Sequence, residues 1–220
     1  MKYKLAVFDM DGTILNTLED LADSLNAALE MSGYPQRTLE EVRCFVGNGI
    51  RKLIERGVPA GTPVEMIDKV NSDFTGHYKV HCADKTKPYD GIIPVIRRLL
   101  AAGVKTAVVS NKADYAVQEL CVQYFDGLFD AAVGERAGIA KKPAPDSVNE
   151  VLRHLNVARE DAVYIGDSEV DIATARNAGM DSIIVDWGFR EREFLVKMGA
   201  QRIISAPEEI AEVIFEDESL

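Results

Sequence analysis

Two aspartates stand one residue apart in the segment KLAVFDMDGTIL, at the point where an apolar run ends. Asp9 and Asp11 flank a single methionine there. Carboxylates in such a place can bind a cation, transfer a proton or attack an electrophile. An aspartate after a strand can also simply cap the next helix, so the pair alone does not select among these chemistries.

Other apolar runs end in polar side chains as well. TAVVS ends in Ser110 and is followed by Asn111. AVYIG is followed by Asp167 and then, after three more residues, by Asp171. In a parallel sheet all these strand ends lie at one edge, which is where open α/β sheets bind ligands.

The loop GERAGIAKKPAPD adds two adjacent lysines, Lys141 and Lys142, to the same set. Taken singly, these groups have simpler interpretations as helix caps, turn residues and solvated surface lysines. Together they do not, because four carboxylates at one edge repel one another unless a cation joins them. Mg²⁺ takes oxygen ligands together with substrate phosphate, and a lysine and a hydroxyl suit phosphate oxygens. A metal, a lysine and a nucleophilic carboxylate together indicate phosphoryl transfer.

The elements that must position these residues follow from the apolar pattern. Strand-like runs cover residues 3–9, 104–110, 130–135, 161–167, 181–186 and a short 201–205. Segments with apolar residues at helical spacing lie between them. This alternation predicts an α/β fold with a Rossmann-like, doubly wound and mostly parallel sheet, covered by helices on both faces.

Residues 17–83 interrupt the alternation and contain no convincing strand. TLEDLADSLNAALEMSG has apolar residues on one helical face, and TLEE (38–41) has the pattern of a capping box. We interpret 17–83 as an all-helical cap domain inserted after the first strand. Residues 1–16 and 84–220 then form the catalytic core domain, and the two crossings between the domains would allow a hinge.

Composition restricts the partners of the chain. Acidic residues outnumber basic ones by 36 to 25 in 220 residues, and the net charge of −11 argues against nonspecific nucleic-acid binding and against anionic membranes. No apolar run approaches membrane-spanning length, and no leader segment is apparent. Three widely spaced cysteines fit a reducing compartment, so the expected location is the cytoplasm.

DMDGT, SNK, KP and GDSEVD, in this order and each at a strand end or in an adjoining loop, resemble the four signatures of the haloacid-dehalogenase-like superfamily of hydrolases. The DxDGT form is that of its phosphatases and phosphomutases, and the insertion after the first signature matches its subclass with a helical cap. VGNGIRKLIERG and AGMDSIIVDWGFRE resemble the phosphoglycolate-phosphatase-like branch.

The resemblance implies separate roles for the two aspartates. Asp9 would attack phosphorus and become an aspartyl-phosphate. Asp11 would protonate the leaving oxygen and later deprotonate water, so the two carboxyl groups need different environments. The backbone carbonyl of Asp11 would also bind the metal. Gly12 would let backbone N–H groups approach phosphate, and Thr13 would hold that turn.

The resemblance also implies roles for the residues of the other three signatures. Ser110 and the backbone N–H of Asn111 would bind the transferring phosphoryl group. Lys142 would neutralise its charge, with Lys141 left as the alternative. Asp167 would bind Mg²⁺ directly, and Asp171 would support the metal either directly, through water or through Lys142.

The glycine-rich stretch VGNGIR in the cap is the candidate for substrate specificity. Gly47, Asn48 and Gly49 break helices, so the stretch can be a plain joint between helices. In relatives with a cap this region contacts the leaving group, and Arg51 could then pair with a substrate carboxylate.

The expected function is therefore a Mg²⁺-dependent phosphatase that hydrolyses a small phosphorylated metabolite, with 2-phosphoglycolate as the leading substrate and a monomer or weak homodimer as the expected state. A sugar-phosphate mutase and a pyrophosphatase or nucleotidase of the same superfamily remain as alternatives. A phospho-receiver signalling domain also uses a strand-end aspartate, acidic Mg²⁺ ligands and a lysine. Asp11 and the long helical insertion argue against that domain.

Overall fold

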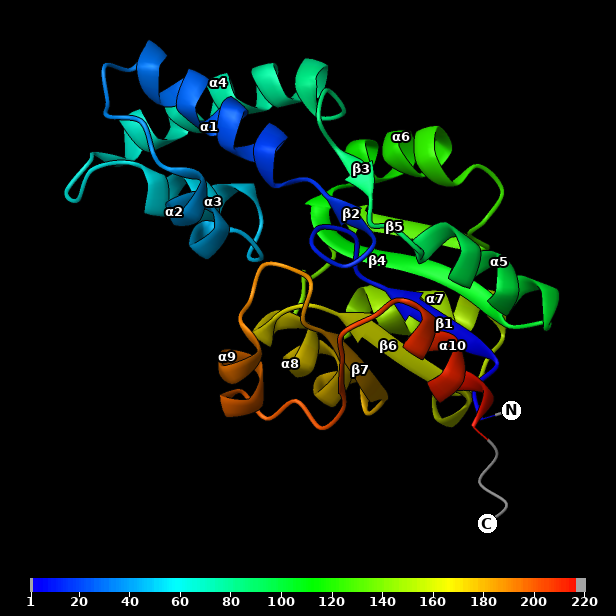
Figure 1. Cartoon of the computed structure of the whole chain (residues 1–220). Helices are drawn as coiled ribbons and strands as arrows, with labels where there is room; N and C mark the ends of the chain where they lie inside the picture. The colour runs from blue at the N-terminus through cyan, green and yellow to red at the C-terminus, as the bar shows by residue number, and fades with distance from the viewer. Residues whose placement is uncertain (1, 217–220) are drawn as a thin grey trace. The chain divides into compact units, whose positions relative to one another are not determined.

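The computed structural model describes residues 2–216, and its chain divides into two compact units. One unit holds the residues up to Leu15 and those from Pro88 onward, and the other holds Asn16–Lys87. Figure 1 labels the elements of both. Among the described helices, none combines the length and the apolar character needed to cross a membrane.

The larger unit contains a six-stranded sheet in the order β5-β4-β1-β6-β7-β8. Every neighbouring pair is parallel, which confirms the predicted α/β class. The strands are β1 (Leu5–Phe8), β4 (Lys105–Ala113), β5 (Ala131–Glu135), β6 (Ala162–Gly166), β7 (Asp181–Val185) and β8 (Ile203–Ile204). β1 is central and fully buried, as a strand covered on both faces must be.

Helices cover the two faces of this sheet. Helices α7 (Asp146–Leu155) and α8 (Glu169–Ala178) share a core with side chains such as Leu5 and Val7 of β1. On the opposite face, Phe8 meets Phe129 edge to face, and Phe129 in turn meets Phe125 at the end of α6 (Asp114–Phe125). Helices α5 (Ile92–Ala101) and α10 (Glu208–Phe215) pack on each other on the near side of the sheet in Figure 1.

Three helical elements were not predicted from the sequence, and one of them is α10. A 3-10 turn, η1 (Arg159–Asp161), precedes β6. Helix α9 (Arg192–Lys197) follows β7 and has only six residues, too few to show a helical period. Leu195 of α9 nevertheless packs on Ile172 and Ile184 in a small satellite core.

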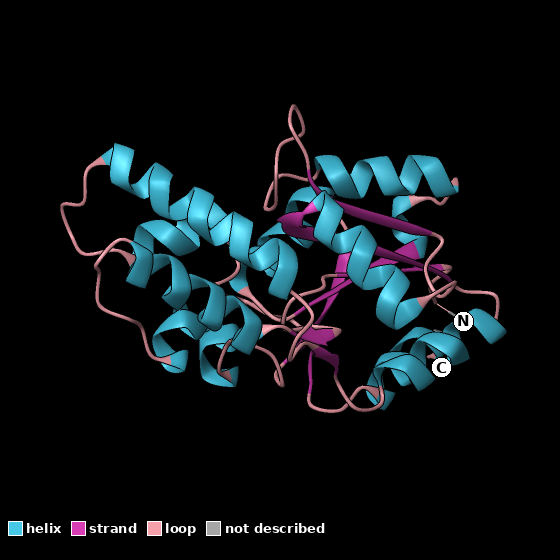
Figure 2. Cartoon of the chain, turned by 90° about the horizontal axis from the view of Figure 1, so that it is seen from above, coloured by secondary structure: helices cyan, strands magenta, loops and turns pink. Residues whose placement is uncertain are grey.

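The smaller unit is built from α1 (Leu18–Met31), α2 (Leu39–Phe45), α3 (Ile50–Gly57) and α4 (Val64–His81), joined by loops (Figure 2). The apolar face predicted for α1 is buried, and α1 packs along α4. The capping box is present: Thr38 Oγ1 accepts the Glu41 amide at 3.2 Å, and Glu41 Oε2 accepts the Thr38 amide at 2.8 Å.

The two connections between the units pair with each other. β2 (Leu15–Asn16) and β3 (Lys87–Pro88) form a two-stranded sheet. Just before β3, the buried carboxylate of Asp20 accepts the backbone amides of residues 85 and 86 at 2.8–3.1 Å. These bonds tie residues 85 and 86 to α1, and the division therefore falls after Lys87, later than the boundary expected at residue 83.

Candidate active site

The sheet register aligns the end of β1 with the end of β6 and with the middle of β4. Phe8, the last residue of β1, stands opposite Val108 of β4 and Ile165 of β6. Asp9 therefore leaves the sheet beside the end of β6 and beside the part of β4 that leads into Ser110. This is the crossover point at which a doubly wound sheet opens a crevice for ligands.

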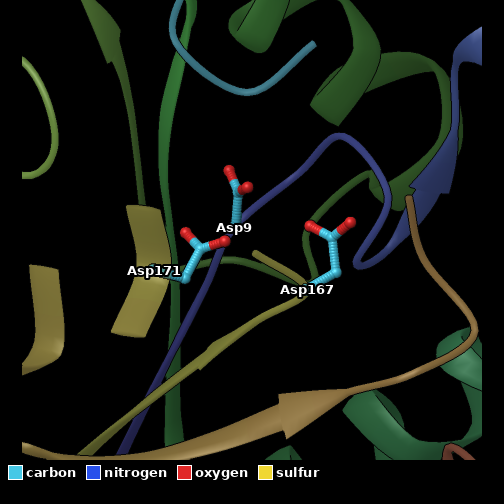
Figure 3. Close-up of side chains that lie close together, drawn as sticks. All are labelled: Asp9, Asp167 and Asp171. Atoms are coloured by element: carbon cyan, nitrogen blue, oxygen red, sulfur yellow. The ribbon is translucent and has the colours of Figure 1, made fainter. Parts of the chain in front are cut away.

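Three of the predicted acidic residues meet at this edge. Asp9, Asp167 and Asp171 each offer a carboxylate oxygen, and these oxygens all lie within 4.8 Å of one another (Figure 3). Burial raises the pKa of Asp9 to about 7, and the charge of Asp171 adds to the rise. Burial, followed by the charges of Asp171 and Asp9, raises the pKa of Asp167 well above its usual value. Buried oxygens that repel one another in this way form a donor set suited to a hard divalent cation.

Lys142 supplies one positive charge to this cluster. Its Nζ lies 2.8 Å from Asp9 Oδ1 and 2.9 Å from Asp171 Oδ1, and the lysine side chain is only 3% exposed. Burial alone would lower the pKa of Lys142, but the carboxylates of Asp171 and Asp9 outweigh it and raise that pKa well above the usual value. The neighbouring Lys141 lies nearer the surface, with Nζ 3.5 Å from Glu135, so Lys142 is the lysine of this site.

Both oxygens of Asp171 are already engaged. Oδ1 accepts Lys142 Nζ and, at 3.3 Å, the hydroxyl of Tyr164. Oδ2 accepts the amide and the hydroxyl of Ser168 at 3.1 and 2.6 Å, in a capping box that begins α8. These contacts fix the carboxylate of Asp171, and through it the ammonium of Lys142, in one orientation.

The turn after β1 is packed against Asp167. Gly12 has φ +85°, and a Cβ at this position would overlap Asp167 Oδ2. Thr13 Oγ1 donates to Asp167 Oδ1 at 3.3 Å. The turn therefore needs glycine for its backbone conformation and for its close approach to the carboxylate.

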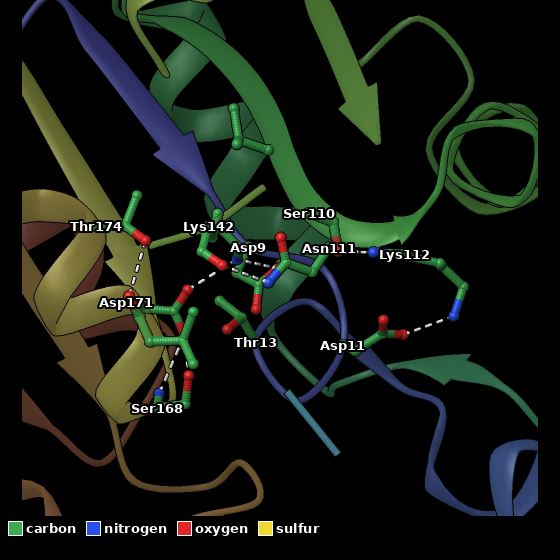
Figure 4. A network of polar contacts seen from close by, with 12 residues as sticks. Asp9, Asp11, Thr13, Ser110, Asn111, Lys112, Lys142, Ser168, Asp171 and Thr174 are labelled. Atoms are coloured by element: carbon green, nitrogen blue, oxygen red, sulfur yellow. Dashed lines mark hydrogen bonds and ion pairs between the residues drawn. The ribbon is translucent and has the colours of Figure 1, made fainter. Parts of the chain in front are cut away.

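The end of β4 contributes three consecutive residues, all with buried side chains (Figure 4). Asn111 Nδ2 donates to the carbonyl of Lys142 at 3.0 Å and so fixes the lysine loop. The Lys112 amide donates to Ser110 Oγ at 3.3 Å, and Lys112 Nζ donates to Asp11 Oδ1 at 2.8 Å. Lys112 was not among the predicted site residues, although it is the third residue of the SNK signature.

A second group that the sequence analysis missed is the loop after β7. Phe189 donates its amide to Asp167 Oδ2 at 2.7 Å, and Trp187 Nε1 donates to the carbonyl of Thr13 at 3.1 Å. A Cβ on Gly188 would overlap the side chain of Asp167. From the sequence, packing is the favoured interpretation of Trp187, with a place at the rim of the active edge as the alternative. The signal that could have found this loop is its WGF sequence directly after a strand whose end lies at the same edge.

The predicted specificity residues belong to the helical unit. Gly47 and Gly49 have φ of +114° and +85°, and Gly49 precedes α3. Asn48 Oδ1 accepts Arg56 at 2.7 Å. Arg51 pairs with Glu55 at 3.1 Å and also with Asp68, so carboxylates of its own unit already neutralise its charge. Its role toward a substrate stays a prediction.

Comparison with known proteins agrees with this geometry. The family model described as haloacid dehalogenase-like hydrolase matches residues 6–185. The chain belongs to this family. It is 35% identical to a phosphoglycolate phosphatase of Mesorhizobium japonicum (87% of this chain, 86% of the relative) and 34% identical to one of Psychrobacter arcticus (86% of each chain). A crystal structure from Lactobacillus delbrueckii subsp. bulgaricus superposes with a TM-score of 0.94 at 41% identity, covering 99% of this chain and 100% of that one.

Membership of the family and the named relatives establish the class of reaction. The protein is a phosphatase, a hydrolase of phosphoric monoester bonds, and it resembles the phosphoglycolate phosphatases within the family. Its substrates are accordingly small phosphorylated compounds, and phosphatases of this family generally use a divalent metal. The cluster of Asp9, Asp167 and Asp171 is compatible with one.

Proposed function

We propose that this phosphatase hydrolyses 2-phosphoglycolate with Mg²⁺ and passes through an aspartyl-phosphate on Asp9. The observation that carries the proposal is the contact of Lys142 with Asp9 at 2.8 Å, at the sheet edge that also holds Ser110 and Asp167. A carboxylate held by a buried ammonium keeps a defined direction. It is also surrounded by the groups that a phosphoryl group needs.

In the first half-reaction, Asp9 attacks phosphorus and an O–P bond forms as the bond to the leaving oxygen breaks. Asp11 gives its proton to that oxygen, so the leaving group departs as an alcohol. Lys142 opposes the charge that builds up on the phosphoryl oxygens, and the hydroxyl of Ser110 donates to one of them.

In the second half-reaction, Asp11, now ionised, takes a proton from water as the water oxygen attacks phosphorus. The bond between phosphorus and Asp9 breaks, inorganic phosphate leaves, and both aspartates return to their starting states. One group thus serves as acid and then as base, which requires its pKa to differ from that of Asp9.

The residues that would hold Mg²⁺ are Asp9 and Asp167 through their side chains and Asp11 through its backbone carbonyl. Asp171 supports the set by fixing Lys142. When bound, the metal supplies positive charge to the transferring phosphoryl group and to Asp9. Mg²⁺ is favoured over Ca²⁺ because Ca²⁺ prefers more ligands and a looser geometry.

The choice of 2-phosphoglycolate rests on the names of the relatives at 34–35% identity. The groups of the sheet edge bind only a phosphoryl group, which every phosphomonoester has, so the cap is expected to select the leaving group. Arg51 is the candidate for the substrate carboxylate, and binding would require it to exchange Glu55 or Asp68 for the ligand.

The test is a screen of phosphorylated metabolites in Mg²⁺ and in chelator. We expect the highest kcat/KM for 2-phosphoglycolate, no turnover in chelator, and a phospho-enzyme detectable by mass spectrometry that Asp9→Asn does not form. Preferential conversion of one sugar phosphate into another would replace the proposal with a mutase. Arg51→Ala should lower kcat/KM for phosphoglycolate about tenfold or more and spare p-nitrophenyl phosphate, which has no carboxylate.

We also propose that the enzyme works in the cytoplasm as a monomer or weak homodimer. None of the three cysteines forms a disulfide in the described part of the chain, which suits a reducing compartment. Sedimentation at several protein concentrations checks the assembly state.

A further inference from the structure

The end of β4 departs from regular strand geometry beside the site. Its register with β5 shifts between Val109 and Ala113. In a regular strand, successive side chains point to opposite faces of the sheet. Here Ser110, Asn111 and Lys112 are all buried, and each makes a hydrogen bond to another site residue. The irregularity therefore brings a third polar residue, Lys112, to the catalytic edge.

Lys112 is bound to two functional groups at once. Its amide donates to the hydroxyl oxygen of Ser110, and its ammonium donates to Asp11 Oδ1. The side chains of Lys112 and Asp11 are 3% and 15% exposed. Turning the carboxyl group of Asp11 away would remove this acceptor from a nearly buried ammonium, which is costly whether or not the other oxygen of Asp11 carries a proton. Asp11 can turn about two side-chain bonds, and the fixed ammonium selects one orientation for its carboxylate.

That orientation separates Asp11 from the other acidic residues. The carboxylates of Asp9, Asp167 and Asp171 form one cluster, whereas Asp11 is turned toward Lys112 (Figure 4). In-line displacement at phosphorus places the nucleophile and the leaving oxygen on opposite sides of the transferring group. An acid that serves the leaving oxygen must therefore stand apart from the nucleophile.

We propose that Lys112 is a positioning residue that holds the carboxylate of Asp11 toward the leaving oxygen without itself touching the reacting atoms. The inference rests on the proposed function, in which Asp11 acts as acid and then as base. A graded series of leaving groups separates this role from a structural one, because a good leaving group departs without protonation and a poor one does not.

The experiment compares Lys112→Met with the wild type on 2,4-dinitrophenyl, p-nitrophenyl and phenyl phosphate and on 2-phosphoglycolate, all in Mg²⁺. The matched control is Lys105→Met, which removes one lysine from the exposed start of the same strand. Thermal melts of both variants report folding. If Lys112→Met does not fold, Lys112→Gln, which keeps a hydrogen-bond donor, runs through the same series.

For Lys112→Met we expect kcat/KM to fall less than about threefold on 2,4-dinitrophenyl phosphate. On phenyl phosphate and phosphoglycolate it should fall about ten- to a hundredfold, which is part of the acceleration that a general acid contributes. On 2,4-dinitrophenyl phosphate, kcat and KM should fall together, because hydrolysis of the phospho-enzyme then limits turnover and Asp11 is its base. In an Asp11→Asn background, Lys112→Met should have less than about a twofold further effect, as expected when one residue acts through the other.

An equal loss on all four esters would overturn the inference and leave Lys112 a structural residue. The inference would also be overturned if Lys112→Met lowered kcat/KM as much in the Asp11→Asn background as it does in the wild type. A wild type that hydrolyses none of the esters would instead overturn the proposed function, and the inference with it.

Discussion

Raising the pH of the metal-free protein from about 4 to about 7 should lower its free energy of unfolding. An aspartate in an unfolded chain has a pKa of 3.8, and burial, with the charge of Asp171, raises the pKa of Asp9 to about 7 in the folded state. Between these values the folded state holds a proton that the unfolded chain has released. Stability is therefore greatest below the lower pKa and falls as the pH rises through the higher one.

The size of the loss in stability follows from the shift in the pKa of Asp9. A change from 3.8 to about 7 at about 1.4 kcal/mol per unit gives about 4 kcal/mol as an upper limit. For a chain of this length that corresponds to about 8–16 °C in Tm. Mg²⁺ should reverse the loss, because binding to the folded state alone adds stability in proportion to the logarithm of ligand concentration.

Thermal melts from pH 4 to 8, in chelator and in excess Mg²⁺, measure both effects. The useful quantity is the difference in stability between wild type and Asp9→Asn, because titrating groups that do not interact with Asp9 cancel in it. Asp90→Asn, an exposed change of the same chemical kind, is the control and should follow the wild type. Mg²⁺ should stabilise Asp167→Asn only slightly, because this variant lacks one of the proposed metal ligands.

Two results would refute the reasoning. One is a free energy of unfolding of the wild type that, relative to that of Asp9→Asn, stays constant or rises from pH 4 to 7. The other is Mg²⁺ stabilising Asp167→Asn as much as the wild type, which would place the metal elsewhere.

Asp9→Asn should lose hydrolysis of p-nitrophenyl phosphate while keeping a cooperative thermal transition, because an amide is not a nucleophile toward phosphorus; near-normal turnover would exclude Asp9 from that role. Gly188→Ala should lower Mg²⁺-dependent activity and cost about 1–3 kcal/mol in denaturant unfolding, since its Cβ would overlap Asp167. Gly76→Ala is the control, because a Cβ there meets nothing within 4 Å. Asp20→Ala should cost about 1–3 kcal/mol and speed hydrogen exchange at the two amides that its carboxylate accepts; unchanged exchange would assign those amides to other partners.

The sequence predicted the strand ends of the site well, because buried parallel strands are continuous apolar runs and their polar ends stand out. Asp9, Ser110 and Asp167 each follow such a run, and the parallel register then brings them together without further information. The choice between Lys141 and Lys142 needed the structure. Adjacent lysines differ only in the direction that the loop gives each side chain, and no periodic pattern records that direction.

Lys112 was missed for a different reason. A regular strand alternates its faces, so the pattern TAVVSNK offers no ground for three successive side chains in one site. The register shift in β4 that permits it depends on pairing with β5, a partner distant in sequence. The loop from Trp187 to Phe189 has no periodicity either, and its bonds to Thr13 and Asp167 are purely tertiary.

The pairing of β2 with β3 has a consequence for how this protein can change over evolutionary time. Hydrogen-bonded strands lie about 4.8 Å apart, so the chain enters and leaves the helical insert at nearly one point. An insert with adjacent ends can be lengthened, exchanged with that of a relative or shortened to a tight turn without displacing β1 or the residues that follow it. Under the proposed function, in which the insert selects the leaving group, substrate choice and bond cleavage would be separable parts of one gene. A chimera that joins a foreign insert at Leu15 and Pro88 should then inherit the reaction from this chain.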